Sequence, residues 1–300
     1  MKYIIGIDSG GTKTEAIVYD LAGNELQQTI TGFGNMLVDY NEGLSNIKSA
    51  VQTIFDSRKP EDCQVLVLGL AGIDSGDLRD ILTKELAEFN VPIVLLNDGQ
   101  LAHYAMLKGE SGVLVIAGTG SVCLGMKMGD WYRVGGWGHL FGDEGSAYYI
   151  GKRAIQQALS EYDLGSQYSL LTQELFAYFQ VSTVLELVKK AYQAKKDQIA
   201  GLAQMVSELS EKESIAATIL TEAGTQLAIE VEKVVTKMHV NNQPVNIALN
   251  GSVIEKDDVV RHSFFSYLRH CSFEGQIVEK EHSSAKGAYY FYKKNGESNQ

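Results

Sequence analysis

The stretch GIDSGGTKTEAIVYD, residues 6–20, decides how the chain begins to fold. It comes within one residue of a Walker A phosphate loop, but Thr12 separates Gly11 from Lys13. A helix should open after such a loop, whereas residues 14–19 are rich in β-branched and aromatic side chains, which favour a strand. The stretch therefore predicts a strand, a tight glycine turn and a second strand. Glycines in such a turn let a phosphate approach backbone N–H groups.

The same pattern returns later in the chain. Residues 112–117 are apolar, Gly118-Thr119-Gly120-Ser121 forms a glycine turn, and residues 122–126 are again apolar. The turn is not a dinucleotide fingerprint, because Cys123 stands where the last glycine would be and a strand is expected next. Its N–H groups and the Thr119 hydroxyl can meet a phosphate, and an ordinary hairpin turn is the alternative. The repeat indicates two domains of like architecture.

Elsewhere, apolar runs alternate with stretches of helical periodicity. Buried strands are expected at 65–70 and 92–96, and residues 143–239 are mostly helical. We predict an α/β chain with an N-terminal domain at 1–109 and a C-terminal domain at 110–284. The second domain carries a helical insertion at about 160–240, and a closing helix at 285–300 packs on the first domain.

Composition limits the classes of partner. The 26 Lys and Arg residues against 37 Asp and Glu give a net charge of −11, which disfavours nucleic acids and anionic membranes. No apolar run approaches the roughly 18 residues of a membrane helix, so a cytoplasmic protein is expected. The cysteines are odd in number and lack C-x-x-C spacing, which predicts inert, buried thiols in a reducing compartment: Cys63, Cys123 and Cys271.

Six motifs carry a resemblance to a known family. They run in order from residue 6 to about 288: GIDSGGTKTE, LNDGQLAHYA, VIAGTGSVCLG, GGWGHLFGDEGSAYYIG, ALNGSV and SSAKGA. Together they resemble the N-acetylglucosamine kinase branch of the BadF-type ATPases, within the actin, heat-shock chaperone and hexokinase superfamily. The resemblance implies two actin-like (ribonuclease H-like) domains with a cleft between them, and it is compatible with a homodimer.

The resemblance also implies an activity, the ATP-dependent phosphorylation of an amino sugar at its 6-hydroxyl. N-acetylglucosamine is the expected substrate, with N-acetylmuramic acid and glucosamine as alternatives. Ala71 stands where the animal enzymes have a serine that touches the sugar, which leaves the choice among these open. ATP and Mg²⁺ are the implied cosubstrate and metal.

Roles for single residues follow from the resemblance as well. Asp8 is the Mg²⁺ ligand, through water, and Asp98 is the general base that faces the sugar hydroxyl. The implied sugar-binding residues are Asn35, Asp98, Gly135, Gly136, Trp137 and Asp143. The implied ATP-binding residues are Ser9, Gly10, Gly11, Thr12, Gly118, Thr119, Gly120, Ser121, Gly251 and Ser252, with Lys13 as an added positive charge.

Each of these residues has a plainer interpretation. Asp8 could cap the hairpin as an Asx turn, and Asp98 could be the N-cap of the helix that follows it. Trp137 could be a core residue, while Asp143 would open a helix and complement its dipole. Asn35 could be a loop residue, and Lys13 an exposed strand lysine.

Two other functions are alternatives, and the first of them shares the phosphate motifs. An activator ATPase of the 2-hydroxyacyl-CoA dehydratase type couples ATP hydrolysis to electron transfer through an iron–sulfur cluster. Such a cluster needs cysteines close together at a dimer interface, and the three cysteines here are scattered. A non-catalytic sugar sensor would be expected to have lost Asp8 or Asp98, and both are present.

Overall fold

The structure is a computed structural model that describes residues 1–240, 243–271 and 273–296. The chain divides into two compact units, and each is described by itself. Unit 1 is Met1–Ser111 with Val278–Gln300, and unit 2 is Gly112–Ile277. Residues 278–284, which the sequence analysis places in the second domain, lie in unit 1.

Unit 1 is built on a five-stranded sheet with the strand order β3-β2-β1-β4-β5. β1, β2 and β3 form an antiparallel meander, and β4 and β5 add parallel to β1. The prediction of a strand, a glycine turn and a second strand is therefore confirmed. The strands are Tyr3–Ser9 (β1), Thr14–Asp20 (β2), Glu25–Thr31 (β3), Cys63–Leu70 (β4) and Ile93–Asn97 (β5).

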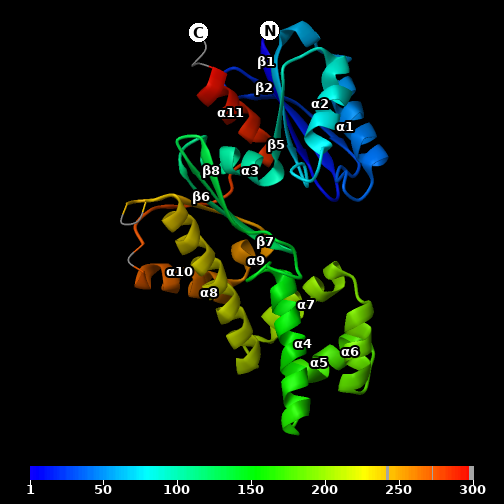
Figure 1. Ribbon diagram of the computed structural model, residues 1–300, viewed down its shortest axis with the longest axis vertical. Helices are drawn as coiled ribbons and strands as arrows, with labels where there is room; N and C mark the ends of the chain where they lie inside the picture. Colours follow the sequence, from blue (N-terminus) through cyan, green and yellow to red (C-terminus); the bar gives the residue numbers. More distant parts are fainter. Residues whose placement is uncertain (241–242, 272, 297–300) are drawn as a thin grey trace. The chain divides into compact units, whose positions relative to one another are not determined.

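Helices cover both faces of this sheet (Figure 1). α1 and α2 contribute to one apolar core with β1 and β4, whereas α3 and α11 pack on the opposite face. Gly6 of β1 allows this packing, because a side chain there would collide with the Ala285 carbonyl. The bounds are Tyr40–Phe55 (α1), Leu78–Leu86 (α2), Asp98–Met106 (α3) and Gly287–Gly296 (α11). Residues 297–300 of the predicted closing helix lie outside the described residues.

Unit 2 repeats the same architecture, as the sequence predicts. Its sheet has the order β10-β9-β6-β7-β8, in which β6, β7 and β8 form the meander and β9 runs parallel to β6. The strands are Gly112–Ala117 (β6), Ser121–Lys127 (β7), Asp130–Gly135 (β8), Ile247–Asn250 (β9) and Ile277–Val278 (β10).

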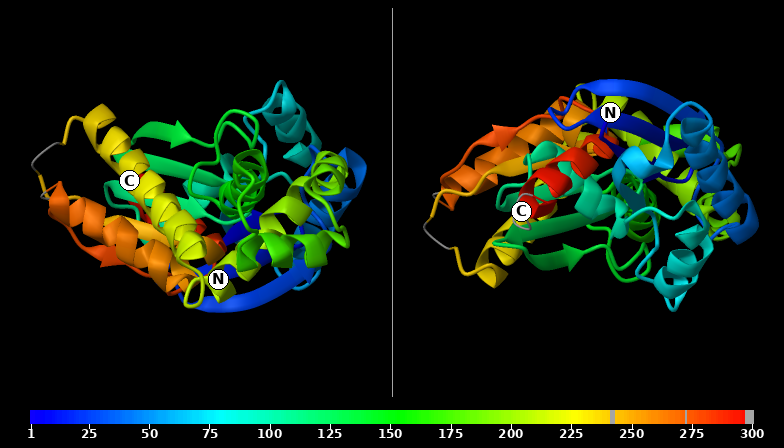
Figure 2. Two further views of the ribbon diagram at one scale, coloured as in Figure 1. Left: turned by 90° about the horizontal axis from the view of Figure 1, so that it is seen from below. Right: turned by 90° about the horizontal axis from the view of Figure 1, so that it is seen from above.

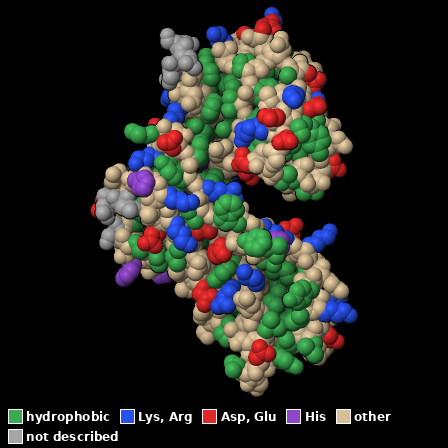
Figure 3. Space-filling view, in the orientation of Figure 1, with side chains coloured by type: hydrophobic (Ala, Val, Ile, Leu, Met, Phe, Trp, Pro, Cys, Tyr) green, Lys and Arg blue, Asp and Glu red, His purple; other side chains and the backbone are tan. Residues whose placement is uncertain are grey.

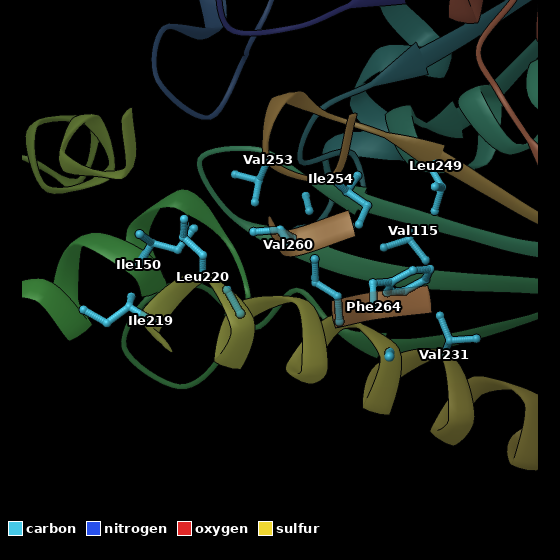
Figure 4. Close-up of a cluster of buried hydrophobic side chains, with 14 of the residues drawn as sticks. Val115, Ile150, Ile219, Leu220, Val231, Leu249, Val253, Ile254, Val260 and Phe264 are labelled. Carbon is cyan, nitrogen blue, oxygen red and sulfur yellow. The ribbon is translucent and has the colours of Figure 1, made fainter. Parts of the chain in front are cut away.

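The predicted helical insertion is present between β8 and β9. α8 and α10 run side by side (Figure 2) and pack with the sheet into the core of unit 2. Figure 4 shows Phe264 of α10 near Val115 of β6 and Val231 of α8. The helices of the insertion are Ala147–Leu164 (α4), Leu170–Phe179 (α5), Val184–Gln193 (α6), Lys196–Leu209 (α7) and Ser214–Lys237 (α8). After β9 follow Ser252–Lys256 (α9) and Asp258–His270 (α10).

Close packing of α8 on α10 depends on Gly224. An added Cβ at this position would overlap the Val260 carbonyl and lie 2.9 Å from the Ser263 Cβ. Alanine usually stabilises a helix by about 1 kcal/mol relative to glycine, but overpacking costs about 1–3 kcal/mol. We therefore expect Gly224→Ala to lower the free energy of unfolding in urea titrations. Gly201→Ala is the matched control, since its nearest neighbour is the Tyr178 hydroxyl at 3.2 Å, and it should be neutral or stabilising. Equal effects of the two substitutions would contradict the packing argument.

The surface carries mixed charges. On the face drawn in Figure 3, Lys and Arg side chains are scattered among Asp and Glu side chains. In the part of the chain that the structure describes, no helix has the length and apolar character needed to cross a bilayer.

Candidate active site

The glycine turn between β1 and β2 leaves its backbone open. The two strands stay in register up to the pair Ser9 and Thr14, and the Gly10 amide donates to the Lys13 carbonyl at 3.1 Å. A Cβ placed on Gly10 or Gly11 would meet nothing within 4 Å. An anion can therefore approach the N–H groups of this turn closely.

Two side chains predicted to bind ATP at this turn already have partners in unit 1. The fully buried Ser9 has its Oγ 2.9 Å from the Thr14 Oγ1, and the Lys13 Nζ lies 2.8 Å from the Glu15 Oε1. Thr12 is exposed on the turn. The side chain of Ser9 is thus too buried to meet a phosphate, whereas the backbone amides, Thr12 and the ammonium group of Lys13, whose side chain is 53% exposed, can reach one.

The loop that contains Asn35 is tied to the same turn. The Gly34 amide donates to the Gly10 carbonyl at 3.0 Å, and a side chain on Gly34 would collide with Ser9. Asn35 follows directly and accepts a hydrogen bond from the Leu37 amide with its Oδ1 at 3.1 Å. The predicted sugar contact Asn35 and the predicted phosphate turn therefore lie at one corner of unit 1.

Asp8 and Asp98 meet at this corner as well. β1, β4 and β5 are parallel neighbours, so Asp8 near the end of β1 and Asp98 just after β5 come to the same sheet edge. Burial, followed by the charge of Asp98, raises the pKa of Asp8 to about 6, against the opposing effects of the charge of Lys280 and a hydrogen bond from Ser284. Asp8 lies within β1, opposite Glu15, so the Asx-turn interpretation is wrong.

The N-cap of α3 is Asn97, not Asp98. The Asn97 Oδ1 accepts from the Gln100 amide at 2.7 Å, and the Gln100 Oε1 accepts from the Asn97 amide at 3.1 Å. This capping box satisfies the start of the helix without Asp98. The N-cap interpretation of Asp98 is therefore wrong, and its carboxylate is placed one residue into the helix, where it accepts from the Gly99 amide at 2.9 Å.

The Asp8 and Asp98 pair suits a hard divalent cation. Among the described residues no group of three or more His, Cys, Asp or Glu side chains could hold a metal. Mg²⁺, however, is commonly bound by one or two carboxylates together with waters and substrate phosphates. Two mutually repelling carboxylates beside an open glycine turn fit that type of site.

In unit 2, the glycine turn Gly118–Ser121 is anchored to the start of α4. The Ala147 amide donates to the Gly118 carbonyl at 2.9 Å, and the Ser121 Oγ donates to the Glu144 carbonyl at 2.7 Å. A strand follows the turn, as predicted, and Thr119 is exposed. The exposed hydroxyl available at this turn is therefore that of Thr119, whereas Ser121 is buried.

Asp143 lies behind this turn and does not open a helix. α4 begins at Ala147 with Ser146 as its N-cap, because Asp143 (φ 64°) and Gly145 (φ 76°) have left-handed backbones. The buried Asp143 carboxylate accepts from the Ser121 amide at 3.4 Å and forms an ion pair with the Lys196 Nζ at 2.8 Å. The prediction of a first-turn acid is wrong, and the sequence analysis missed Lys196.

A pocket of about 460 Å³ lies beside this turn, between α4, α7 and α9. Ala147, whose amide donates to the Gly118 carbonyl of the turn, lines it together with Ser252, one of the predicted ATP contacts. Gly251 has φ 109°, and its Cα lies so close to the Ala117 backbone that no side chain would fit. Further lining residues from α7 are Ala200, Gly201, Gln204 and Ser207.

The Gly135-Gly136-Trp137 segment at the end of β8 is held by Arg133. The Arg133 Nε donates to the Gly135 carbonyl at 3.0 Å, and its guanidinium also donates to the Gly136 carbonyl. The guanidinium lies 4.8 Å from the centre of the Trp137 ring. Trp137 is 67% exposed, so the interpretation as a core residue is wrong. An exposed, fixed indole ring is a suitable surface for the apolar face of a sugar.

Glu230 lies beneath this segment, and it makes the free energy of unfolding depend on pH. A side chain on Gly135 would collide with the buried Glu230 carboxyl, and no described group hydrogen-bonds its Oε2. Burial, followed by the charge of Glu144, raises the pKa of Glu230 from 4.5 to about 8. The folded state therefore loses stability as pH rises from about 4.5 through about 8, by at most about 1.4 kcal/mol per pH unit.

We expect Glu230→Gln to flatten this slope. Urea unfolding at several pH values between 5 and 9 should show the variant gaining stability relative to the unmodified protein as pH rises. Glu174→Gln, at an exposed position on α5, should follow the unmodified protein at every pH. Parallel curves for the Glu230 variant and the unmodified protein would contradict the assignment.

The cysteines only partly match the expectation. Cys63 and Cys123 are buried, and burial raises the pKa of the Cys63 thiol to about 12 and that of Cys123 as well. Cys271 is exposed, so the prediction of three buried thiols is wrong for it. All three are free thiols, and they lie in different elements: at the start of β4, in β7 and directly after α10.

Comparison with known proteins places the chain among sugar kinases and their relatives. It is 29% identical over 300 residues to the N-acetylmuramic acid/N-acetylglucosamine kinase of Clostridium acetobutylicum, covering 96% of this chain and 97% of the relative. It is also 29% identical to the N-acetyl-D-glucosamine kinase of Dictyostelium discoideum, covering 85% of this chain and 86% of that protein.

Solved structures confirm the fold class. A Chromobacterium violaceum protein provisionally classed as an N-acetylglucosamine kinase superposes with a TM-score of 0.72 at 23% identity, covering 96% of this chain and 98% of its own. A ROK family glucokinase from Streptomyces griseus, solved with glucose and AMPPNP, gives 0.56 at 17% identity, covering 96% and 97%. At these identities the likeness establishes the fold of two actin-like domains and not the substrate.

The family is shown by the sequence itself. The sequence model of one family matches residues 5–291, which is nearly the whole chain and includes all six motifs. The chain therefore belongs to the BadF/BadG/BcrA/BcrD ATPase family.

Proposed function

We propose that the protein transfers the γ-phosphoryl group of ATP to the 6-hydroxyl of an amino sugar. N-acetylglucosamine is the first candidate, and N-acetylmuramic acid and glucosamine are the alternatives. The observation that carries the proposal is the pair Asp8 and Asp98 at one sheet edge beside an open glycine turn. The curated relatives, which are named as kinases of these sugars, support the substrate class.

Asp98 is the proposed general base. In the reaction the sugar O6 forms a bond to the γ-phosphorus, the bond from that phosphorus to the β–γ bridging oxygen breaks, and ADP leaves. The hydroxyl proton passes to the Asp98 carboxylate, which is free of the N-cap role because Asn97 fulfils it. Asp8 would hold Mg²⁺, through water, and that ion neutralises charge on the β- and γ-phosphates when bound.

The remaining predicted residues bind and orient ATP and the sugar. The amides of Gly11, Thr12 and Thr119 donate to phosphate oxygens, while those of Gly10 and Gly118 donate to carbonyls within their own turns. The adenosine occupies the pocket lined by Ser252 and α7. The sugar contacts Asn35 and the exposed Trp137, whose orientation Arg133 fixes.

The test is the release of ADP from ATP and Mg²⁺ by the purified protein. It is measured with N-acetylglucosamine, N-acetylmuramic acid, glucosamine, N-acetylmannosamine and glucose, and without sugar. We expect strong stimulation by one or two of the first three sugars, with a 6-phosphate as product. Hydrolysis that is independent of sugar would favour the activator ATPase instead, and binding of a sugar without turnover would favour a sensor.

A further inference from the structure

We propose that Lys196, the first residue of α7, binds the phosphates of ATP. The inference rests on the proposed function, because it assumes that the pocket beside the Gly118–Ser121 turn holds the nucleotide. Lys13, the lysine predicted for the phosphates, belongs to the glycine turn of unit 1. The helical insertion supplies a lysine beside the glycine turn of unit 2.

The position of Lys196 joins the pocket to the phosphate turn. Residues three and four apart share one side of a helix, so Lys196 lies in line with Ala200 and Gln204, which line the pocket. At its other end the Lys196 Nζ reaches the Asp143 Oδ2 at 2.8 Å. The Asp143 carboxylate lies directly against Gly120, where an added Cβ would be 2.9 Å from the Oδ2. The ammonium group is therefore one side chain away from the turn.

Charge explains why a cation is needed at this place. The Asp143 side chain is 4% exposed, and an unpaired carboxylate buried behind the turn would repel the phosphates. Lys196 neutralises this charge, and its side chain is still 34% exposed. An ammonium group has three donors, and Lys196 meets the Asp143 Oδ2 in an ion pair that lacks the geometry of a hydrogen bond. Its donors can be given to phosphate oxygens without breaking the ion pair.

A purely structural role makes a different prediction. If Lys196 only fixes α7 to the turn through Asp143, its loss would disturb the pocket as a whole, and adenosine would bind as poorly as ATP. If Lys196 contacts phosphate, its loss weakens ADP and ATP but leaves adenosine almost unaffected. Comparing these three ligands therefore separates the two roles.

The experiment is calorimetric titration of the full chain with adenosine, ADP and ATP. For Lys196→Ala and Lys196→Gln we expect the Kd of ADP and ATP to rise about tenfold or more, and the Kd of adenosine to change less than twofold. Gln keeps a donor for Asp143, so it remains informative if the alanine variant does not fold. The control is Lys195→Ala, which removes the same charge from the exposed neighbouring position and should leave all three affinities unchanged.

Several results would overturn the inference. Unchanged ADP affinity in both Lys196 variants is one, and an equal loss for adenosine and ADP is another. Lys256 also lines the pocket. A loss of ADP affinity with Lys256→Ala and none with the Lys196 variants would show that Lys256, and not Lys196, binds the phosphates. The readout is binding and uses no sugar. If the unmodified protein binds ADP but no amino sugar stimulates turnover, the proposed function fails while the assignment of Lys196 stands.

Discussion

Replacing Asp98 with asparagine is expected to lower kcat by about 10²–10⁴-fold while the Kd of the sugar stays within about threefold. The amide has nearly the shape of the carboxylate but cannot accept the hydroxyl proton. The fold should persist, because the capping box of α3 uses Asn97 and Gln100 rather than Asp98. Sugar binding by calorimetry and turnover by ADP release measure the two effects separately.

The control for this variant is Asp80→Asn. Asp80 occupies the first turn of α2, as Asp98 does in α3, and it is exposed. It should retain full turnover. Near-normal kcat in the Asp98 variant would remove that residue from the mechanism, and a joint loss of sugar binding and turnover would indicate a role in binding alone.

Replacing Asp8 with asparagine should have the second largest effect. We expect the Mg²⁺ concentration that gives half-maximal activity to rise about tenfold and kcat to fall about 10²-fold, since a neutral amide is a poorer ligand for this ion. Activity measured over a series of Mg²⁺ concentrations tests this, with Asp80→Asn again as the control. An unchanged Mg²⁺ dependence would contradict the role of Asp8.

The same substitution should not destabilise the protein when Mg²⁺ is absent. Burial and the neighbouring Asp98 raise the pKa of Asp8 to about 6, which means that folding disfavours its charged form. With EDTA present, we therefore expect Asp8→Asn to have a Tm equal to or above that of the unmodified protein. A variant that is more stable but less active would indicate that the carboxylates of Asp8 and Asp98 repel each other in the folded protein and that this pair is needed for activity.

The sequence predicts the fold well where the signal is local. The glycine turns after Ser9 and Ala117, with β-branched and apolar runs on both sides, identify the two meanders and hence the repeat. The two like sheets follow from that repeat, and the helical periodicity locates the insertion.

The sequence fails where a choice depends on backbone geometry. Asn97 and Asp98 are both good N-caps, and only the extended backbone of Asn97 (φ −76°, ψ 162°) decides which of them caps α3. Likewise, Asp143 looks like a first-turn acid until its left-handed φ of 64° is known. Each error concerns one or two residues, yet each changes which carboxylate is available for chemistry.

Contacts between distant positions are beyond the sequence altogether. The ion pair of Lys196 with Asp143 joins α7 to a loop before α4, and no periodicity links the two residues. Lys13 and Glu15 are only two residues apart, but nothing in the composition indicates that they form an ion pair. Both ion pairs therefore had to come from the structure.

Unit 1 is built from two segments that are separated in the sequence by unit 2. This arrangement has a consequence for biosynthesis. β1 packs against Ala285 and α11, which follow unit 2 in the sequence and leave the ribosome after it, whereas unit 2 is one continuous segment that ends at residue 277. Domains generally fold as units during synthesis. Unit 2 can thus reach its native state first, while one face of the unit 1 sheet stays uncovered until α11 has been synthesised.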